Sequence, residues 1–243
     1  MMFTPLDQAT AATPPRGAPG RYRVVCLGLD VGQLHDPSAL CAVELTERTI
    51  KAADPLFGEW PLRETHFRVL GAERLPLGTS YPDVAARLCL LAKRLYDRDS
   101  SGDYHALVDC TGVGRPIVDL LREQVIPQCH VTAVTLTGGA RGDPDVLWRQ
   151  EASIAKAYMV SRLQALLQSG RITAPMDPDM AAMAAELKTF ELRAKADTGH
   201  LQSGAFVVGS HDDLVTSLAL ACLVDLQEVR YGVAFGDLPS AVL

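Results

Sequence analysis

The sequence lacks the features that mark several common protein classes. Its six cysteines form no Cys-x-x-Cys pair, and most lie within apolar runs, where cysteine acts as a small core residue in a reducing compartment. No apolar run approaches the ~20 residues that span a bilayer. Residues 1–20 are rich in Ala, Thr, Pro and Gly and lack the apolar core of a signal peptide. These absences argue against a disulfide framework, a zinc site and a membrane anchor, and they favour a cytoplasmic location.

Positive charge is also scarce. The chain has 23 Lys and Arg residues against 29 Asp and Glu residues, a formal net charge of −6, which argues against a broad phosphate-binding surface. A carboxylate-rich metal site would itself add negative charge that bound cations offset. The basic residues that could contact phosphates locally are Lys188, Arg193, Lys195 and His200, together with Arg141 and Arg149 around a Gly-rich loop. For each of them, an ordinary solvated charge is the simpler interpretation.

Length and composition predict one domain. The 243 residues suffice for one substantial core, and 48% hydrophobic with 21% charged residues is the composition of an ordinary globular protein. We expect the domain to span residues 21–230, with a flexible tail at 1–20 and a C-terminal tail at 231–243.

Two apolar runs end on an aspartate that is followed by a glycine-containing turn. Residues 23–30 end on Asp30 before Val31-Gly32, and residues 104–109 end on Asp109. Near-continuous apolar runs predict strands covered on both faces, where a carboxylate fits only at the exposed strand end. If the two strands are parallel neighbours, these aspartates lie about 5 Å apart. Two carboxylates at that distance either raise one pKa or bind a cation.

A third acidic site opens an apolar helix near the C-terminus. His211-Asp212-Asp213 follows a strand-like run at 205–208 and precedes the apolar residues 214–221. A helix N-terminus favours one aspartate, because its carboxylate caps free N–H groups. The second aspartate needs another role, which a cation shared with Asp30 and Asp109 would supply. Because clustered carboxylates are the ligands that Mg²⁺ and Mn²⁺ prefer, the pattern predicts a metal site.

The order of apolar runs predicts an α/β fold built on a mixed sheet. The first three expected strands are joined without helices and predict an antiparallel meander with a long middle connection, whereas the last two flank a helix and predict a parallel pair. With the first and fourth strands adjacent, the strand order is 3-2-1-4-5. The expected strands are 22–30, 38–45, 66–75, 105–110 and 130–136. The expected helices are 81–98, 115–124, 148–169, 178–195 and 212–228, with a hairpin at 196–204.

Together these motifs carry a family resemblance. The chain contains, in order, Leu29-Asp30-Val31-Gly32 with Asp36-Pro37-Ser38-Ala39, then Val108-Asp109-Cys110-Thr111-Gly112-Val113-Gly114, then His211-Asp212-Asp213-Leu214-Val215-Thr216-Ser217-Leu218-Ala219-Leu220-Ala221. This order is similar to that of RNase H-like nucleases, and in particular it resembles the nuclease domain of the large terminase subunit of tailed bacteriophages. Residues 185–190 also resemble a stretch of that family. The resemblance covers residues 22–227, and its most specific part is the block at 211–215.

The resemblance implies a fold, an activity and a set of ligands. The fold is the RNase H-like five-stranded sheet flanked by helices, with a helical and hairpin insertion at 137–210. The activity is endonucleolytic cleavage of duplex DNA in viral genome packaging, by two Mg²⁺ or Mn²⁺ ions about 3.5–4 Å apart. Asp30 is the expected central ligand, Asp109 completes one ion site and Asp213 completes the other.

Three more residues are expected beside these ligands. Asp212 lies about 100° around the helix from Asp213, so it caps the helix, orients His211 or replaces Asp213 as the ligand, and the sequence leaves these roles open. Asp36 and His211 are candidates for residues that surround the ligands, although a turn-forming or helix-start role is the simpler interpretation for each.

The chain departs from the family in one respect. Full large terminases place an ATPase before the nuclease, and their partners include the portal and the small terminase subunit. This sequence holds no Gly-x-x-x-x-Gly-Lys-Ser/Thr loop, and the turn at 112–114 lacks the lysine. We therefore expect either the nuclease part of a longer protein or a stand-alone relative, acting in a bacterial or phage-infected cell. It is not the motor by itself.

Three alternatives stay open. A RuvC-like junction resolvase shares carboxylates on this fold, although the long insertion at 137–210 suits a terminase better. A nuclease-inactive docking or assembly module would have the same fold with a degenerate site, against which the four carboxylates argue. Asp30-Val31-Gly32 also resembles the first phosphate loop of sugar and acetate kinases, but the second lobe and second Gly-rich loop of those enzymes have no counterpart here.

Overall fold

The computed structural model describes residues 23–32, 36–54, 58–112, 114–124, 129–138, 149–175, 180–188 and 212–226, with the backbone alone at 51–54 and 58–62. The predicted tails at 1–20 and 231–243 and the predicted hairpin at 196–204 lie outside these residues.

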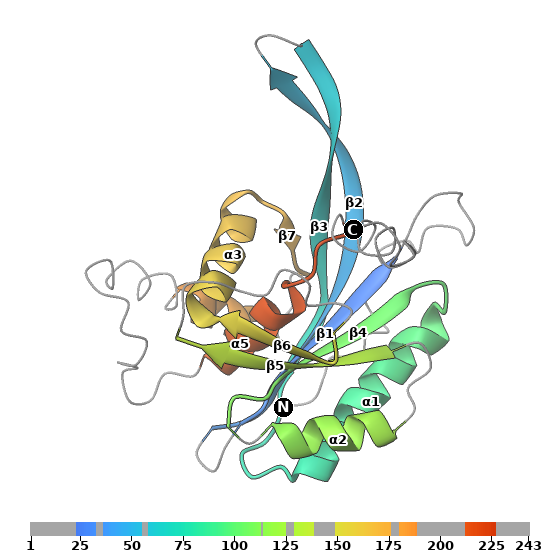
Figure 1. Ribbon diagram of the computed structural model, residues 1–243, viewed down its shortest axis with the longest axis vertical. Coiled ribbons are helices and arrows are strands. Elements are labelled where there is room, and N and C mark those ends of the chain that lie inside the picture. Colours follow the sequence, from blue (N-terminus) through green and yellow to red (C-terminus); the bar gives the residue numbers. More distant parts are fainter. Residues whose placement is uncertain are drawn as a thin grey trace, which may run out of the picture.

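A seven-stranded mixed sheet forms the centre of the protein (Figure 1). Its strands follow the order β6-β5-β4-β1-β2-β3-β7. The predicted order 3-2-1-4-5 is therefore confirmed for the inner strands, and the fold is α/β with the RNase H-like strand order. The predicted count of five is wrong, because a short strand is added at each edge. The strands are β1 (Val24–Asp30), β2 (Ala39–Asp54), β3 (Gly58–Arg74), β4 (Asp103–Asp109), β5 (Cys129–Thr137), β6 (Glu151–Ala155) and β7 (Ile172–Thr173).

The pairing directions agree with the prediction. β1, β2 and β3 form an antiparallel meander, and β4 pairs in parallel with both β1 and β5. Val24–Asp30 is buried up to its last residue, since it lies in the middle of the sheet with helices on both faces. The end of β1 is therefore the place where a polar side chain meets solvent.

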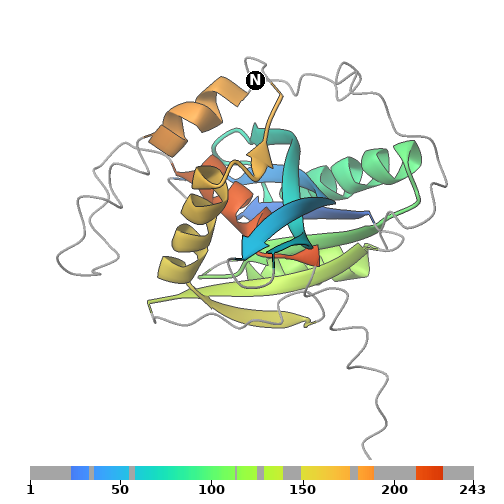
Figure 2. The same cartoon turned by 90° about the horizontal axis from the view of Figure 1, so that it is seen from above.

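Helices cover the two faces of the sheet (Figures 1 and 2). One face carries α1 (Tyr81–Arg98) and α2 (Arg115–Glu123), which share a core with the odd-numbered residues of β1. The other face carries α3 (Lys156–Gln168), the helix at 180–188 and α5 (Asp213–Ala221), which share a core with its even-numbered residues. Both predicted helices before residue 125 are confirmed. None of the described helices has the length and apolarity needed to cross a membrane.

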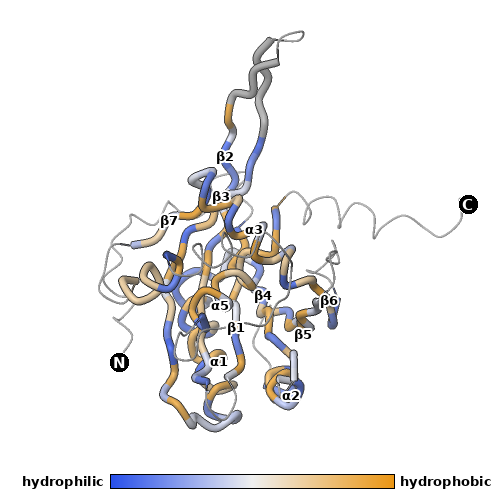
Figure 3. Tube along the Cα trace, turned by 90° about the vertical axis from the view of Figure 1, so that its left-hand side faces the viewer, coloured by the Kyte–Doolittle hydropathy of each residue, from blue (hydrophilic) through white to orange (hydrophobic). Residues whose placement is uncertain are grey.

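The helix α5 presses directly on the central strand at a glycine. A Cβ atom added to Gly28 would lie 1.9 Å from the Ser217 carbonyl oxygen, a distance that real Cβ atoms essentially never show. Only glycine therefore permits this approach. All nine residues of α5 are buried, and Figure 3 shows hydrophobic residues gathered where α5 crosses the central strands. This crossing fixes α5 relative to the end of β1.

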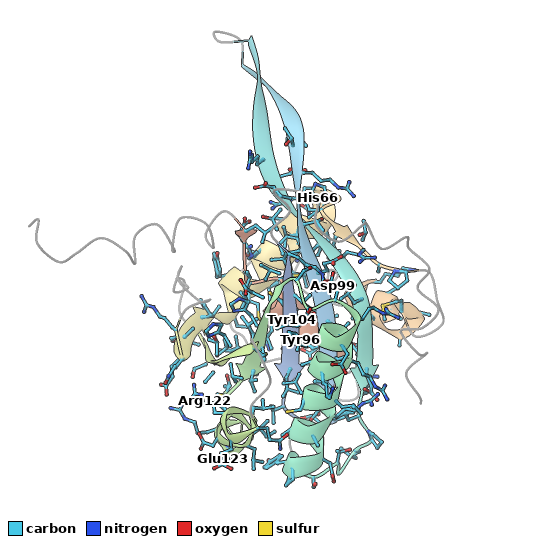
Figure 4. The ribbon with its side chains drawn as sticks, turned by 90° about the vertical axis from the view of Figure 1, so that its right-hand side faces the viewer. His66, Tyr96, Asp99, Tyr104, Arg122 and Glu123 are labelled. Carbon is cyan, nitrogen blue, oxygen red and sulfur yellow. The ribbon has the colours of Figure 1, made fainter. Side chains whose placement is uncertain are left out.

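A polar and aromatic cluster fixes the opposite end of β1 and β4. Arg23 Nε donates to Glu44 Oε1 at 2.7 Å, and Arg23 Nη1 donates to the Tyr104 hydroxyl at 3.0 Å. That hydroxyl donates to the Asp99 carbonyl at 2.7 Å, and the Tyr104 ring meets Tyr96 edge-on at 5.8 Å (Figure 4). These contacts tie β1, β2, β4 and the end of α1 together, and so they support the register that aligns the far ends of β1 and β4.

Two predicted boundaries are wrong. A helix was expected throughout 148–169, but Glu151–Ala155 forms β6, which pairs in parallel with β5, and α3 begins only at Lys156. The reason is a short alternation in which Glu151 and Ser153 are exposed while Ala152 and Ile154 are buried. The expected middle connection of the meander is also not a loop: β2 and β3 continue past the core and project as a long hairpin (Figure 1).

The last helix is shorter than expected. α5 ends at Ala221 rather than 228. The Arg162 side chain donates to the Cys222 carbonyl at 2.7 Å and to the Val224 carbonyl at 3.1 Å. These carbonyls would otherwise accept from a continuing helix, so the arginine satisfies them in a turn instead. The helix at 180–188 falls within the predicted span of 178–195, of which 189–195 lie outside the described residues.

Candidate metal centre

Three charged side chains lie in one row at the end of the central strands. Asp30 pairs with Ala39, and Ala39 pairs with Arg74. Leu29 pairs with Val108 one position earlier, so Asp109 lies beside Asp30 in the same row. Residues paired across strands project to the same face, and successive residues alternate between faces. Because Cys26, Leu107 and Ala72 belong to the core under α5, the side chains of Asp30, Asp109 and Arg74 project to the α5 face.

The helix α5 brings its first turn to this row. Asp213 is the first residue of α5 and is only 6% exposed. Asp212 precedes it at the cap position, but its side chain makes no capping hydrogen bond. The cap role, one of the three roles left open for Asp212, is therefore not seen in the structure. Four aspartates from two strands and one helix start thus approach the same end of the sheet, as the sequence pattern predicts.

These carboxylates act on one another electrostatically. The pKa of Asp30 is raised well above its ordinary value, first by burial and then by the negative charges of Asp109, Asp213 and Asp212. The pKa of Asp109 is raised by burial, and this rise is opposed by hydrogen bonds from Thr111, whose backbone N–H donates to Asp109 Oδ1 at 2.7 Å. In this environment Asp30 favours either a proton or a nearby cation.

Two cations already lie beside the carboxylates. The positive charge of Lys156, at the start of α3, lowers the pKa of both Asp30 and Asp109. Arg74 Nε lies 3.4 Å from Asp213 Oδ2, and the same guanidinium pairs with Glu186. None of these three residues was predicted for the site. A signal was present only for Glu186, which lies in the stretch 185–190 that carries part of the family resemblance.

The donor chemistry of this site fits a hard divalent cation. Carboxylate oxygens are the ligands that Mg²⁺ and Mn²⁺ take, and the mutual repulsion seen at Asp30 is what such an ion neutralises. Asp30, Asp109 and Asp213 would hold the ions, with Asp212 beside them. As they stand, the described side chains include no set of three or more His, Cys, Asp or Glu residues that could hold a metal ion.

The structure describes only some of the other predicted residues. Asp36 is exposed and lines a cavity of about 300 Å³ together with Gly32, Ser38 and Tyr81, next to the turn that follows β1. Lys188 lies exposed at the end of the helix at 180–188, and Arg149 is exposed just before β6. The remaining predicted residues lie outside the described part of the chain: Arg141, Arg193, Lys195, His200 and His211.

Comparisons with known proteins give matches among solved structures only. No family model matches the sequence. No curated protein matches it either. The manganese-soaked, inhibitor-bound terminase nuclease domain of human cytomegalovirus is 12% identical, with 81% of this chain and 80% of that chain covered and a TM-score of 0.43. RuvC of Thermus thermophilus with a Holliday junction substrate is 14% identical, with 82% and 91% covered and a TM-score of 0.28. RuvC of the same organism in a second structure is 13% identical, with a TM-score of 0.26 and the same coverage.

Proposed function

We propose that the protein is a metal-dependent endonuclease that cleaves duplex DNA, of the kind found in the large terminase subunit. The observation that carries this proposal is the convergence of carboxylates from separate elements on Asp30. Burial and the charges of Asp109, Asp213 and Asp212 all raise the pKa of Asp30 at the exposed end of the central strand. A partly buried carboxylate cluster of this kind costs stability unless a cation compensates for it. Groups with shifted pKa values also tend to gather at functional sites.

Each residue of the proposed site has a role that its position in the fold determines. Bound Mg²⁺ or Mn²⁺ ions supply an activated water and stabilise charge on the leaving oxygen. Asp30 would be the central ligand, because β1 is flanked by β4 and covered by α5. Thr111 holds one oxygen of Asp109 in place by its 2.7 Å hydrogen bond. Lys156 favours the ionised forms of Asp30 and Asp109.

The proposed substrate is duplex DNA without strict sequence preference. The net charge of −6 implies weak binding by this chain alone, and activity that falls steeply with salt. Lys188 contributes an exposed charge at the end of the helix at 180–188, and Arg193, Lys195 and His200 follow it in sequence. An ATPase domain, a portal and a small terminase subunit are the partners that this role implies, in a bacterial or phage-infected cell.

Plasmid nicking and metal binding together test the proposal. We expect Asp30→Asn to reduce Mn²⁺-dependent nicking by about 100-fold or more and to weaken Mn²⁺ binding measured by calorimetry. The matched control is Asp97→Asn, an exposed aspartate that pairs with Lys93 on α1. Cleavage that persists in EDTA, or that Asp30→Asn leaves intact, would contradict the proposal. Strict preference for a four-way junction over linear duplex would assign the same site to a RuvC-like resolvase.

A further inference from the structure

We propose that Arg74 is a built-in counter-ion of this site, which pairs with Asp213 in the metal-free protein and competes with a divalent cation for that carboxylate. This inference rests on the proposed metal-dependent function and adds to it a residue that opposes metal binding.

Arg74 joins three elements of the fold. It is the last residue of β3, and its guanidinium pairs with Glu186 on the helix at 180–188. Its Nε lies 3.4 Å from Oδ2 of Asp213 at the start of α5. The arginine side chain is 28% exposed, whereas the two carboxylate side chains are 11% and 9% exposed. One half-buried guanidinium thus neutralises two nearly buried carboxylates from separate helices.

Arg74 Nη2 donates a hydrogen bond to Glu186 Oε1, whereas the contact of Arg74 Nε with Asp213 is not a hydrogen bond. Within the described part of the chain, Glu186 Oε2 and Arg74 Nε are buried atoms without a hydrogen-bond partner. The pairing of Arg74 with Asp213 is therefore mainly electrostatic, and a second cation can displace it without breaking a well-formed hydrogen bond. After displacement from Asp213 the guanidinium can remain paired with Glu186, which already contacts the same arginine.

The row geometry makes the two cations competitors. Arg74 and Asp30 lie in one row across β3, β2 and β1, and both side chains project to the α5 face. Asp213 interacts with both residues: its carboxylate contacts Arg74, and its negative charge acts on Asp30. An ion bound to Asp213 at a carboxylate–metal distance of about 2.1 Å would lie only about 5–6 Å from the guanidinium charge. Arg74 therefore repels such an ion or moves away from it.

Removing the positive charge of Arg74 should strengthen the binding of a divalent cation. At the dielectric constant of water, the repulsion between a single and a double positive charge about 5.5 Å apart corresponds to about tenfold in affinity. We therefore expect Arg74→Gln to bind Mn²⁺ about tenfold more tightly than the wild type, in titrations followed by calorimetry or by the electron paramagnetic resonance signal of free Mn²⁺. In EDTA the same variant should melt at a lower temperature, because two carboxylates lose their shared cation.

Two further variants test whether a change in Mn²⁺ affinity comes from the charge of Arg74 or from the loss of an ion pair in the fold. Arg87→Gln is the matched control: Arg87 Nε pairs with Glu73 Oε2 at 2.8 Å, one residue earlier on β3. Glu73 pairs across strands with Leu40, which belongs to the core on the opposite face, so this change removes a similar ion pair away from the site. Arg74→Lys retains the charge and should keep Mn²⁺ affinity within about twofold of the wild type.

The outcomes distinguish this inference from the proposed function. Tighter Mn²⁺ binding in Arg74→Gln, with no change in Arg87→Gln or Arg74→Lys, supports the inference. If the wild type binds Mn²⁺ through Asp30 and Arg74→Gln binds it equally or more weakly, Arg74 is no competitor and only the inference is overturned. An equal gain in Arg74→Lys would also overturn it, because charge would not be the cause. If neither the wild type nor Arg74→Gln binds Mn²⁺, both proposals are wrong.

Discussion

The contact between Gly28 and α5 gives the sharpest mechanical prediction. In Gly28→Ala the new methyl group would lie 1.9 Å from the Ser217 carbonyl oxygen, whereas ordinary contact begins at 3.4 Å. Strand or helix must therefore separate by about 1.5 Å, and both partners are backbone in a close-packed core. Overpacking of this kind costs about 1–3 kcal/mol or more. Because Asp213 is one turn away on the same helix, it would move with α5 relative to Asp30.

Denaturant unfolding and plasmid nicking measure the two consequences separately. We expect Gly28→Ala to lower the free energy of unfolding by about 3 kcal/mol, at the upper end of the overpacking range. Nicking by the fraction that stays folded should fall by about 100-fold, since a displacement of about 1 Å in a catalytic geometry has an effect of that order. Gly138→Ala is the control, because a Cβ there meets no atom within 4 Å. A Gly28→Ala variant with wild-type stability and activity would refute the proposed packing of α5 on β1.

Two predictions concern pH. Asp30 has a raised pKa in the folded state, so its ionisation destabilises the fold as pH rises from the unfolded pKa near 4 through the folded pKa. In EDTA, Asp30→Asn should therefore raise the melting temperature at pH 7. This gain should vanish near pH 4. A constant gain at both pH values would contradict the shift. Burial, followed by the charge of His130, lowers the pKa of His105 to about 4. The free energy of unfolding should therefore fall by up to ~3 kcal/mol as pH falls from 6.5 to 4. His105→Gln should flatten that part of the plot of melting temperature against pH. An unchanged slope in this variant would assign the acid sensitivity to other groups.

The sequence predicted the parts of the fold whose signal is local and long. β1 and β4 were recognisable because each is a continuous apolar run that ends on an aspartate before a glycine turn, and this shared pattern is what predicted their parallel pairing. α1 was recognisable from its periodicity, and the structure adds the Ser80 side chain, which accepts from the Asp83 N–H at the start of the helix. The proximity of Asp30 and Asp109 then follows from strand order, whereas Asp213 reaches them through the packing of α5 on β1.

The missed features depend on contacts between distant residues. Five residues of β6 alternate within a longer helical pattern, and only the free edge of β5 decides their conformation. The projecting ends of β2 and β3 pair with each other as a hairpin, and this pairing depends on the partner strand and not on a local pattern. Arg74 meets Glu186 across 112 positions of the chain, a pairing that no local pattern encodes.

The position of Asp213 also sets the order in which the site can form during synthesis. Asp30 belongs to the first strand and Asp213 to the last described helix, so their carboxylates meet only when α5 packs over Gly28. A ribosome releases the N-terminal strands first, and long-range contacts of this kind form late. A nascent chain that has emerged only through β5 contains both β1 and β4, yet it still lacks the third carboxylate. The three carboxylates would therefore come together only after α5 has been made.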